Sequence, residues 1–185
     1  MNGVIVRVGR WLVAGLLGMS CLGWTLAVQA EVRDPQTHFF QPKFGDLPAD
    51  LVTARQEGRR GILLMYEMDD CPFCDRMKRT VLNQTSVQAY FREHFLIYSI
   101  DVRGGASLTD FAGQTVTEKQ FALEQRARAT PVFVFYDLEG RSVARFTGAT
   151  QNADEFMLLG RFVAEGHYKA MPFNVYKRQA SGGKQ

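Results

Sequence analysis

The pattern of apolar positions along the chain switches between strand-like runs and helix-like spacing, which predicts that the two kinds of element alternate. Residues 61–67 form a near-continuous apolar run, typical of a strand covered on both faces. Apolar runs also predict strands at 95–102, 131–136 and 142–146, with a turn at 138–141 between the last two. The expected helices cover residues 47–58, 72–82, 86–94, 117–128 and 154–165. This order predicts an α/β fold with a central mixed four-stranded sheet flanked by helices.

Composition divides the chain into four parts: residues 1–30, an extension at 31–46, the domain with the predicted elements at 47–168, and a tail at 169–185. A small polar, glycine-containing insertion near residues 103–117 predicts a loop or a small hairpin. It ends at Thr117, which forms the sequence pattern of a helix capping box with Gln120.

The extension and the tail lack a strong pattern. The extension contains Pro35 and Pro42 and is expected to be irregular, docked on the domain by Phe39, Phe40 and Phe44. The tail retains three aromatic residues just before or within it, so we expect it to pack loosely, and we expect fraying over residues 180–185. Those aromatic residues are Tyr168, Phe173 and Tyr176.

The first 30 residues are typical of a secretory signal peptide. Arg7 and Arg10 give a positive start, an uncharged segment follows from 11 to 30, and small residues at Val28-Gln29-Ala30 suit signal peptidase. An uncleaved membrane anchor is one alternative, because about 20 uncharged residues approach spanning length. A lipid-modified Cys21 is another. Cleavage after Ala30 is favoured, because glycine, serine and threonine dilute the uncharged run and a cleavage site ends it.

Cleavage changes the composition of the mature chain in two ways that matter. Cys21 is removed, which leaves Cys71 and Cys74 as the only cysteines. The formal charge falls from +3 to +1, because the removed segment carries two arginines and no acidic residue. A nearly neutral domain gives no electrostatic reason to expect nucleic acid as a partner. Export places the cysteine pair in an oxidising compartment.

The cysteine pair, Cys71-Pro72-Phe73-Cys74, lies at the expected N-terminus of the helix 72–82. A thiol attacks only as its thiolate, and the N-terminal end of a helix stabilises that anion. We therefore expect Cys71 to be the more exposed thiol and the nucleophile of a dithiol–disulfide exchanger. Cys74, one turn further along the helix, is expected to be partly covered and to act as the resolving thiol.

A bare pair of this spacing is also half of a zinc site. A zinc site needs about four ligands, and the three histidines, His38, His94 and His167, are scattered. Copper binding would use methionines near the pair, such as Met65, but methionine at such positions is more often part of a core. We therefore expect neither a metal nor another cofactor.

A second candidate element is Thr130-Pro131, at the start of a predicted strand. Proline cannot donate a ladder hydrogen bond, so it belongs at the start or edge of a strand. A cis bond before Pro131 would expose the Thr130 backbone to an extended substrate beside the thiol. For an isolated X–Pro bond, however, cis is a minority state of about 6%.

Together these residues resemble the thioredoxin superfamily from about Gly58 to His167. The first part of the resemblance is the strand at 61–67, the pair Cys71-Pro72-Phe73-Cys74 and the helix at 72–82. The second part is the strand that follows a proline, Thr130-Pro131-Val132-Phe133-Val134-Phe135, and the turn at 137–140. More narrowly, the chain is similar to periplasmic thioredoxins associated with sulfur oxidation. The matching segments are Tyr90-Phe91-Arg92, Thr117-Glu118-Lys119 after an insertion at 110–113, and Glu165-Gly166-His167-Tyr168 with Phe173 and Tyr176 beyond.

The resemblance implies a thioredoxin fold, with Cys71 as nucleophile, Cys74 as resolving thiol and Pro131 as a cis proline. It also implies a periplasmic reductase of protein disulfides that draws electrons from a membrane-embedded dithiol donor. The chain departs from thioredoxin at the buried aspartate six residues before the first cysteine, because Met65 is found there. Glu67, two residues later on the same strand face, is a candidate proton acceptor for Cys74.

The direction of electron flow rests on the surroundings of the pair. Asp69 and Asp70 disfavour a nearby anion, and Phe73 offers it no hydrogen bond, which favours a reductant. The basic residues Arg76, Lys78 and Arg79 act in the opposite direction, but helix spacing is expected to turn some of them away.

Two alternative functions remain: a disulfide oxidase or isomerase of similar fold, and a non-enzymatic binding module. The presence of both cysteines argues against the module. An isomerase usually dimerises, and no added dimerisation segment is visible, so a monomer is expected.

Overall fold

The computed structural model describes residue 3 and residues 31–182. Apart from Gly3, the expected signal peptide at 1–30 lies outside the described residues and stays a prediction. In the described part of the chain, we find no helix with the length and apolar character needed to cross a membrane.

A four-stranded sheet with the strand order β2-β1-β5-β6 forms the centre of the domain. Its strands are β1 Gly61–Glu67, β2 Phe95–Asp101, β5 Val132–Tyr136 and β6 Ser142–Thr147. Strand β1 pairs in parallel with β2 and antiparallel with β5, and β5 pairs antiparallel with β6. The predicted mixed sheet is therefore confirmed, and each strand lies within one residue of its expected bounds.

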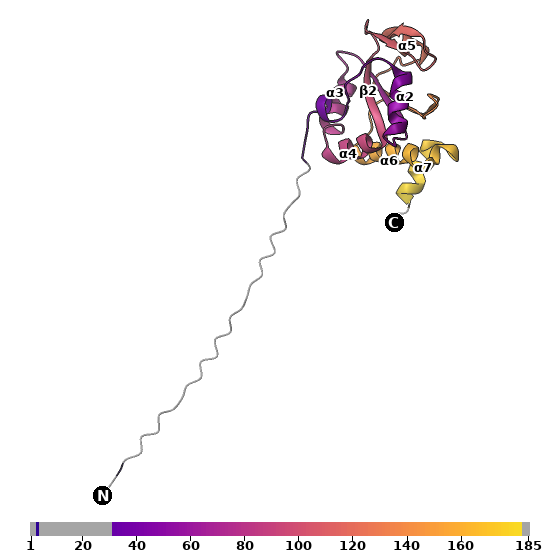
Figure 1. Cartoon of the computed structure of the whole chain (residues 1–185). Coiled ribbons are helices and arrows are strands. Elements are labelled where there is room, and N and C mark those ends of the chain that lie inside the picture. Colours follow the sequence, from indigo (N-terminus) through magenta and orange to yellow (C-terminus); the bar gives the residue numbers. More distant parts are fainter. Residues whose placement is uncertain (1–2, 4–30, 183–185) are drawn as a thin grey trace.

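Helices cover both faces of this sheet. They are α1 Pro35–His38, α2 Leu47–Gln56, α3 Pro72–Thr80, α4 Thr85–His94, α5 Glu118–Glu124, α6 Ala153–Ala164, the 3-10 helix η1 His167–Lys169 and α7 Phe173–Gly182. In Figure 1, α3 and α2 lie on either side of β2. Side chains of β1 alternate between the two faces: Leu63 and Met65 pack with α3, α4 and α6, whereas Leu64 and Tyr66 pack with α2 and α5.

The polar insertion is a small hairpin rather than a loop. Strand β3 (Ser107–Thr109) pairs antiparallel with β4 (Thr115–Thr117). The expected capping box is present, because the Gln120 N–H donates to Thr117 Oγ1 and the Thr117 N–H donates to Gln120 Oε1. Helix α5 ends at Glu124, so the prediction of a helix to about residue 128 was too long. The backbone leaves the helix at Arg126, where φ is 54°.

The N-terminal extension lies along β2, one of the two end strands of the sheet. The Gln41 N–H donates to the Ile97 carbonyl at 2.9 Å, and the Gln41 side chain accepts the Ile97 N–H at 2.6 Å. Lys43 Nζ donates to the Ser99 carbonyl at 2.7 Å. The side chain of Phe44 is 88% exposed, so the expectation that it docks the extension was wrong. Alternate residues of an extended chain point in opposite directions, and here Gln41 and Lys43 face the sheet.

The other two phenylalanines of the extension dock it as expected. Phe39 and Phe40 are buried, and Phe39 packs against Phe91 and Phe156 with ring centroids 5.8 Å and 6.1 Å away. The extension also contains one helical turn, α1, with Pro35 as its first residue. It is therefore more ordered than predicted.

The C-terminal tail is helical up to Gly182, which corrects the prediction of fraying for residues 180–182, while residues 183–185 lie outside the described residues. No residue of this helix, α7, is fully buried. Phe173 and Tyr176 lie three residues apart, on one side of the helix. Each packs against Phe162 of α6 with ring centroids 5.4 Å apart. The helix therefore belongs to the packed domain, and Figure 1 shows it beside α6.

Candidate functional site

The two cysteines lie where β1 ends and α3 begins. Cys71 is the N-cap residue of α3, and Pro72 is its first helical residue, a position where the missing N–H of proline is tolerated. Cys74 lies in the first turn of the helix. The two residues form a disulfide with their Cα atoms 5.2 Å apart. A disulfide between two closely spaced cysteines is thus built into the start of a helix.

Cys71 Sγ accepts two hydrogen bonds. The N–H of Cys74 donates to it at 3.2 Å, and the hydroxyl of Thr130 donates to it at 3.2 Å. The Thr130–Pro131 peptide bond is cis, and Pro131 is buried directly before β5. The two segments that the sequence singled out, 59 residues apart, therefore meet at the Cys71 sulfur.

Both cysteines are largely covered by protein in the disulfide state. Cys71 is 4% exposed and Cys74 is 1% exposed, so Cys71 is the more exposed by a small margin. Both belong to the core cluster that contains Met65 and Met77. Met65, found where thioredoxin has its buried aspartate, is therefore an apolar neighbour of the pair. A partner must approach the sulfur of Cys71 closely to reach it.

Glu67 lies at the end of β1 and is engaged in polar contacts. Its carboxylate forms an ion pair with Lys78 of α3 at 2.5 Å and accepts a hydrogen bond from the Ser99 hydroxyl. These residues line a small cavity of about 190 Å³ together with Asp69 and Asp75. The sequence indicated Glu67 but neither Lys78 nor Ser99 as its partners, because both contacts join different elements.

Two basic residues of α3 have partners other than the cysteine sulfur atoms. Arg76 donates to the Thr150 carbonyl at 3.3 Å, and its guanidinium lies 5.7 Å from the centroid of the Phe73 ring. Lys78 is paired with Glu67. Asp69 and Asp70, on the other side of Cys71 in the chain, are exposed.

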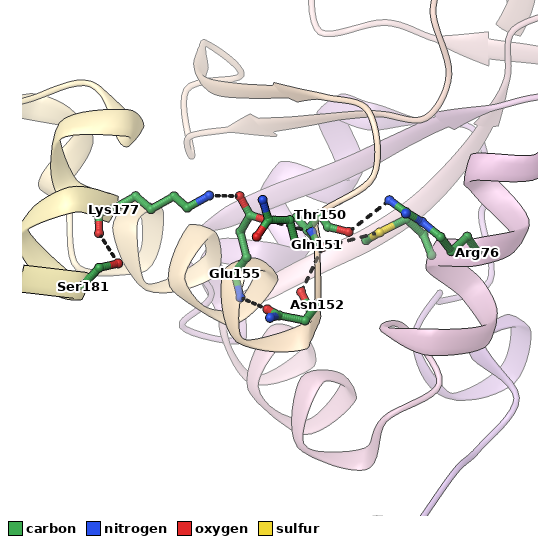
Figure 2. Close-up of polar contacts among 8 residues, drawn as sticks. Arg76, Thr150, Gln151, Asn152, Glu155, Lys177 and Ser181 are labelled. Atoms are coloured by element: carbon green, nitrogen blue, oxygen red, sulfur yellow. Dashed lines mark hydrogen bonds and ion pairs between the residues drawn. The ribbon is translucent and has the colours of Figure 1, made fainter. Parts of the chain in front are cut away.

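Thr150 is a residue of the site region that no sequence signal indicated. Its side chain is buried, and its hydroxyl donates to the Asn152 carbonyl and lies 3.5 Å from Met77 Sδ. Figure 2 shows that the loop with Thr150 and Gln151 separates Arg76 on one side from Lys177 of α7 on the other. The active-site helix is thus in contact with a loop that the C-terminal part of the chain supports.

The loop is anchored at Glu155, in the first turn of α6. The Gln151 N–H donates to Glu155 Oε2 at 2.7 Å, and Lys177 Nζ donates to Glu155 Oε1 at 2.5 Å. Burial alone would raise the pKa of Glu155, but the Gln151 N–H and the Lys177 ammonium outweigh it and lower the pKa below its usual value. The carboxylate therefore stays ionised and keeps both contacts at neutral pH.

Within residues 31–182, no group of three His, Cys, Asp or Glu side chains is arranged to hold a metal ion.

Comparison with known proteins places this geometry among related folds. Residues 47–164 match the family model of the thioredoxin-like domain. The structure is similar to a thioredoxin-fold protein from Helicobacter pylori, with 17% identity, a TM-score of 0.63, and coverage of 78% of this chain and 93% of that one. It is also similar to DsbH oxidoreductase, with 14% identity, a TM-score of 0.52, and coverage of 68% and 85%. No curated protein matches the sequence. At these identities the two structures show the fold alone.

Proposed function

The chain belongs to the thioredoxin-like domain family, and from this premise we propose that it is an exported thiol–disulfide oxidoreductase that reduces protein disulfides in the periplasm. One observation carries the proposal: Cys71 Sγ caps the N-terminus of α3 and accepts hydrogen bonds from Cys74 N–H and the Thr130 hydroxyl. When the disulfide is reduced, both donors and the helix dipole favour the thiolate of Cys71. That makes Cys71 the nucleophile.

The reaction proceeds in two exchange steps. The Cys71 thiolate attacks one sulfur of a substrate disulfide, forms a mixed disulfide, and releases the other substrate sulfur as a thiolate that takes up a proton. Cys74 then loses its proton and attacks Cys71 Sγ. This step releases the second substrate thiol and forms the Cys71–Cys74 disulfide seen in the structure. The substrate gains two electrons from the pair and two protons, one released by Cys74 and one taken from the solvent, to which Cys71 lost its proton when it formed the thiolate.

Two further residues have proposed parts in this cycle. The backbone of Thr130, beside the cis bond to Pro131, aligns an extended substrate segment next to Cys71. Glu67 accepts the proton of Cys74, since it ends the face of β1 on which Met65 belongs to the same core cluster as both cysteines. Its pairing with Lys78 of α3 keeps the carboxylate beside the helix that carries Cys74.

The oxidised pair must be reduced again before the next cycle. A dithiol donor embedded in the membrane fits an exported reductase, because the periplasm is oxidising. The narrower resemblance to periplasmic thioredoxins associated with sulfur oxidation supports this donor. We propose that the protein acts as a monomer.

The contacts around Cys71 support reduction over oxidation. A strong oxidant stabilises its thiolate heavily. Arg76 is instead engaged with Thr150 and Phe73, and Lys78 with Glu67, while Asp69 and Asp70 are exposed nearby. The thiolate therefore gains two hydrogen bonds and the helix dipole, without a charged partner of its own.

Equilibration with glutathione redox buffers tests the direction of electron flow. The free thiols of the protein are counted by alkylation and mass spectrometry. We expect a reduction potential below about −200 mV for the Cys71–Cys74 couple. A potential near or above about −150 mV would make the protein an oxidase instead.

Export is tested separately, by expressing the full chain in a bacterium with a periplasm and sequencing the N-terminus of the product. We expect a periplasmic protein that starts at Glu31. A membrane-bound product that retains residues 1–30 would show an uncleaved anchor.

A further inference from the structure

An exposed phenylalanine lies inside the redox motif. The side chain of Phe73 is 57% exposed, although the cysteines on either side of it are almost fully buried. It lies in the first turn of α3, between the two residues that the disulfide joins. The ring is therefore accessible to a protein that brings a cysteine to Cys71.

An exposed arginine accompanies the ring. Arg76 lies three residues after Phe73 on α3, so the two side chains share a face. Its guanidinium is 5.7 Å from the ring centroid, within the range of a cation–π contact. Among residues 31–182, no carboxylate forms an ion pair with Arg76.

The loop with Thr150 and Gln151, shown in Figure 2, contacts Arg76 and restrains its side chain. One of its N–H groups donates to the Thr150 carbonyl at 3.3 Å. Thr150 is buried against Met77, and the N–H of the next residue, Gln151, donates a hydrogen bond to Glu155. A side chain that is already held in place loses less conformational freedom when it binds a partner. The remaining guanidinium donors have no acidic partner within the described domain.

We propose that Phe73 and Arg76 form a docking ridge that selects protein disulfides whose reacting cysteine is flanked by one apolar and one acidic side chain. The inference rests on the proposed oxidoreductase function and adds the class of substrate. An aromatic face offers a large apolar contact area. A guanidinium offers paired donors that match a carboxylate. The exposed ring and the unpaired cation can thus contact these two kinds of side chain on a substrate.

Two synthetic peptides test the ridge. Each contains one disulfide, and they differ only beside the reacting cysteine: one has leucine and glutamate there, and the other has serine and lysine. The reduced protein is mixed with each peptide, and the single-turnover rate constants are measured. Hydroxyethyl disulfide, which is uncharged and has no flanking side chains, gives the reference rate. The ratio of the two peptide rates cancels any change in thiol reactivity that a substitution causes.

We expect the wild-type protein to react about tenfold faster with the leucine–glutamate peptide. Phe73→Ala and Arg76→Gln should each reduce this ratio by about threefold. High salt should reduce it in the wild type but not in Arg76→Gln, because salt screens the charge contact.

Two matched substitutions serve as controls. Leu123→Ala removes a similarly exposed apolar side chain from α5, and Arg79→Gln removes an exposed arginine one turn further along α3. Both should leave the ratio unchanged.

The possible outcomes distinguish a failure of the docking ridge from a failure of the proposed oxidoreductase function. A wild-type ratio near one, or a ratio unaffected by Phe73→Ala and Arg76→Gln, would overturn the ridge while the reaction with hydroxyethyl disulfide upholds the oxidoreductase. No reaction with any of the three disulfides would overturn the proposed function, and the ridge with it.

Discussion

The hydroxyl of Thr130 donates a hydrogen bond to Cys71 Sγ across 3.2 Å. It joins the segment before β5 to the start of α3, two regions that are far apart in the sequence. A donor at this position stabilises a thiolate more than a neutral thiol. The reactivity of Cys71 therefore depends on a residue outside the cysteine motif.

Removing this donor while keeping the side-chain volume tests the contact. In a Cys74→Ala background, Thr130→Val should slow the alkylation of Cys71 by iodoacetamide at pH 7 by about fivefold, since a hydrogen bond contributes roughly 1 kcal/mol. Thr130→Ser keeps a hydroxyl and should react close to the parent rate. An equal rate in Thr130→Val and Thr130→Ser would contradict the role of the hydroxyl.

The assignment of nucleophile and resolving thiol predicts which variant traps a substrate. Cys74→Ala should accumulate mixed disulfides on Cys71, because the attack that releases the substrate is lost. Non-reducing electrophoresis followed by mass spectrometry measures this. Cys71→Ala should trap far less, and the variant lacking both cysteines should trap nothing. Preferential trapping by Cys71→Ala would reverse the two roles.

The proton-transfer role of Glu67 is tested at the resolving step. Glu67→Gln should slow the decay of the mixed disulfide by about 100-fold, the lower range for a general base. Lys78→Gln is the matched control, since it breaks the same ion pair but keeps the carboxylate. If both variants slow this step equally, Glu67 only holds α3 in place.

The pH dependence of stability should report Asp50, a buried residue of α2. Burial raises its pKa more than the hydrogen bond from Tyr98 lowers it. The folded protein therefore binds this proton at a higher pH than the unfolded chain. Stability is gained as the pH falls from neutral, through the raised pKa, toward the unfolded value.

Chemical denaturation of the wild type and Asp50→Asn at several pH values between 7 and 4 measures this effect. The free energy of unfolding of the wild type, relative to Asp50→Asn, should rise as the pH falls. Tyr98→Phe removes the hydrogen bond to Asp50 Oδ1 and should enlarge the trend. A relative stability that is constant or falls over this range would contradict the raised pKa.

The fold was predictable where the signal is local. The apolar run at 61–67 and the capping box at Thr117 each depend on a few neighbouring residues, and both match the structure. The cysteine pair was also visible locally, because its spacing and the following helix are adjacent in the chain. Thr130 and Pro131 were singled out because a proline began a strand, and the cis bond between them was expected only from the resemblance to the thioredoxin superfamily.

Features that depend on contacts between distant segments were missed. Phe44 is exposed because its neighbours Gln41 and Lys43 face β2, about fifty residues later in the chain. The packing of α7 depends on Phe162 of α6. Thr150 has a common side chain in a loop, and only the folded structure brings it to Arg76. Contacts of this kind do not change the spacing of apolar and polar residues within either segment, so the sequence pattern does not reveal them.

The hydrogen bonds of Gln41 with Ile97 cover part of β2, an end strand of the sheet. An uncovered end strand offers a row of unpaired backbone groups to which another chain can add a strand. Here the extension already occupies those groups at Ile97, and Lys43 adds a charge beside Ser99. Gln41 precedes Ile97 by 56 residues, so the extension is synthesised before the strand that it covers. The extension is therefore available to cover the exposed edge of β2 as soon as this strand joins the sheet.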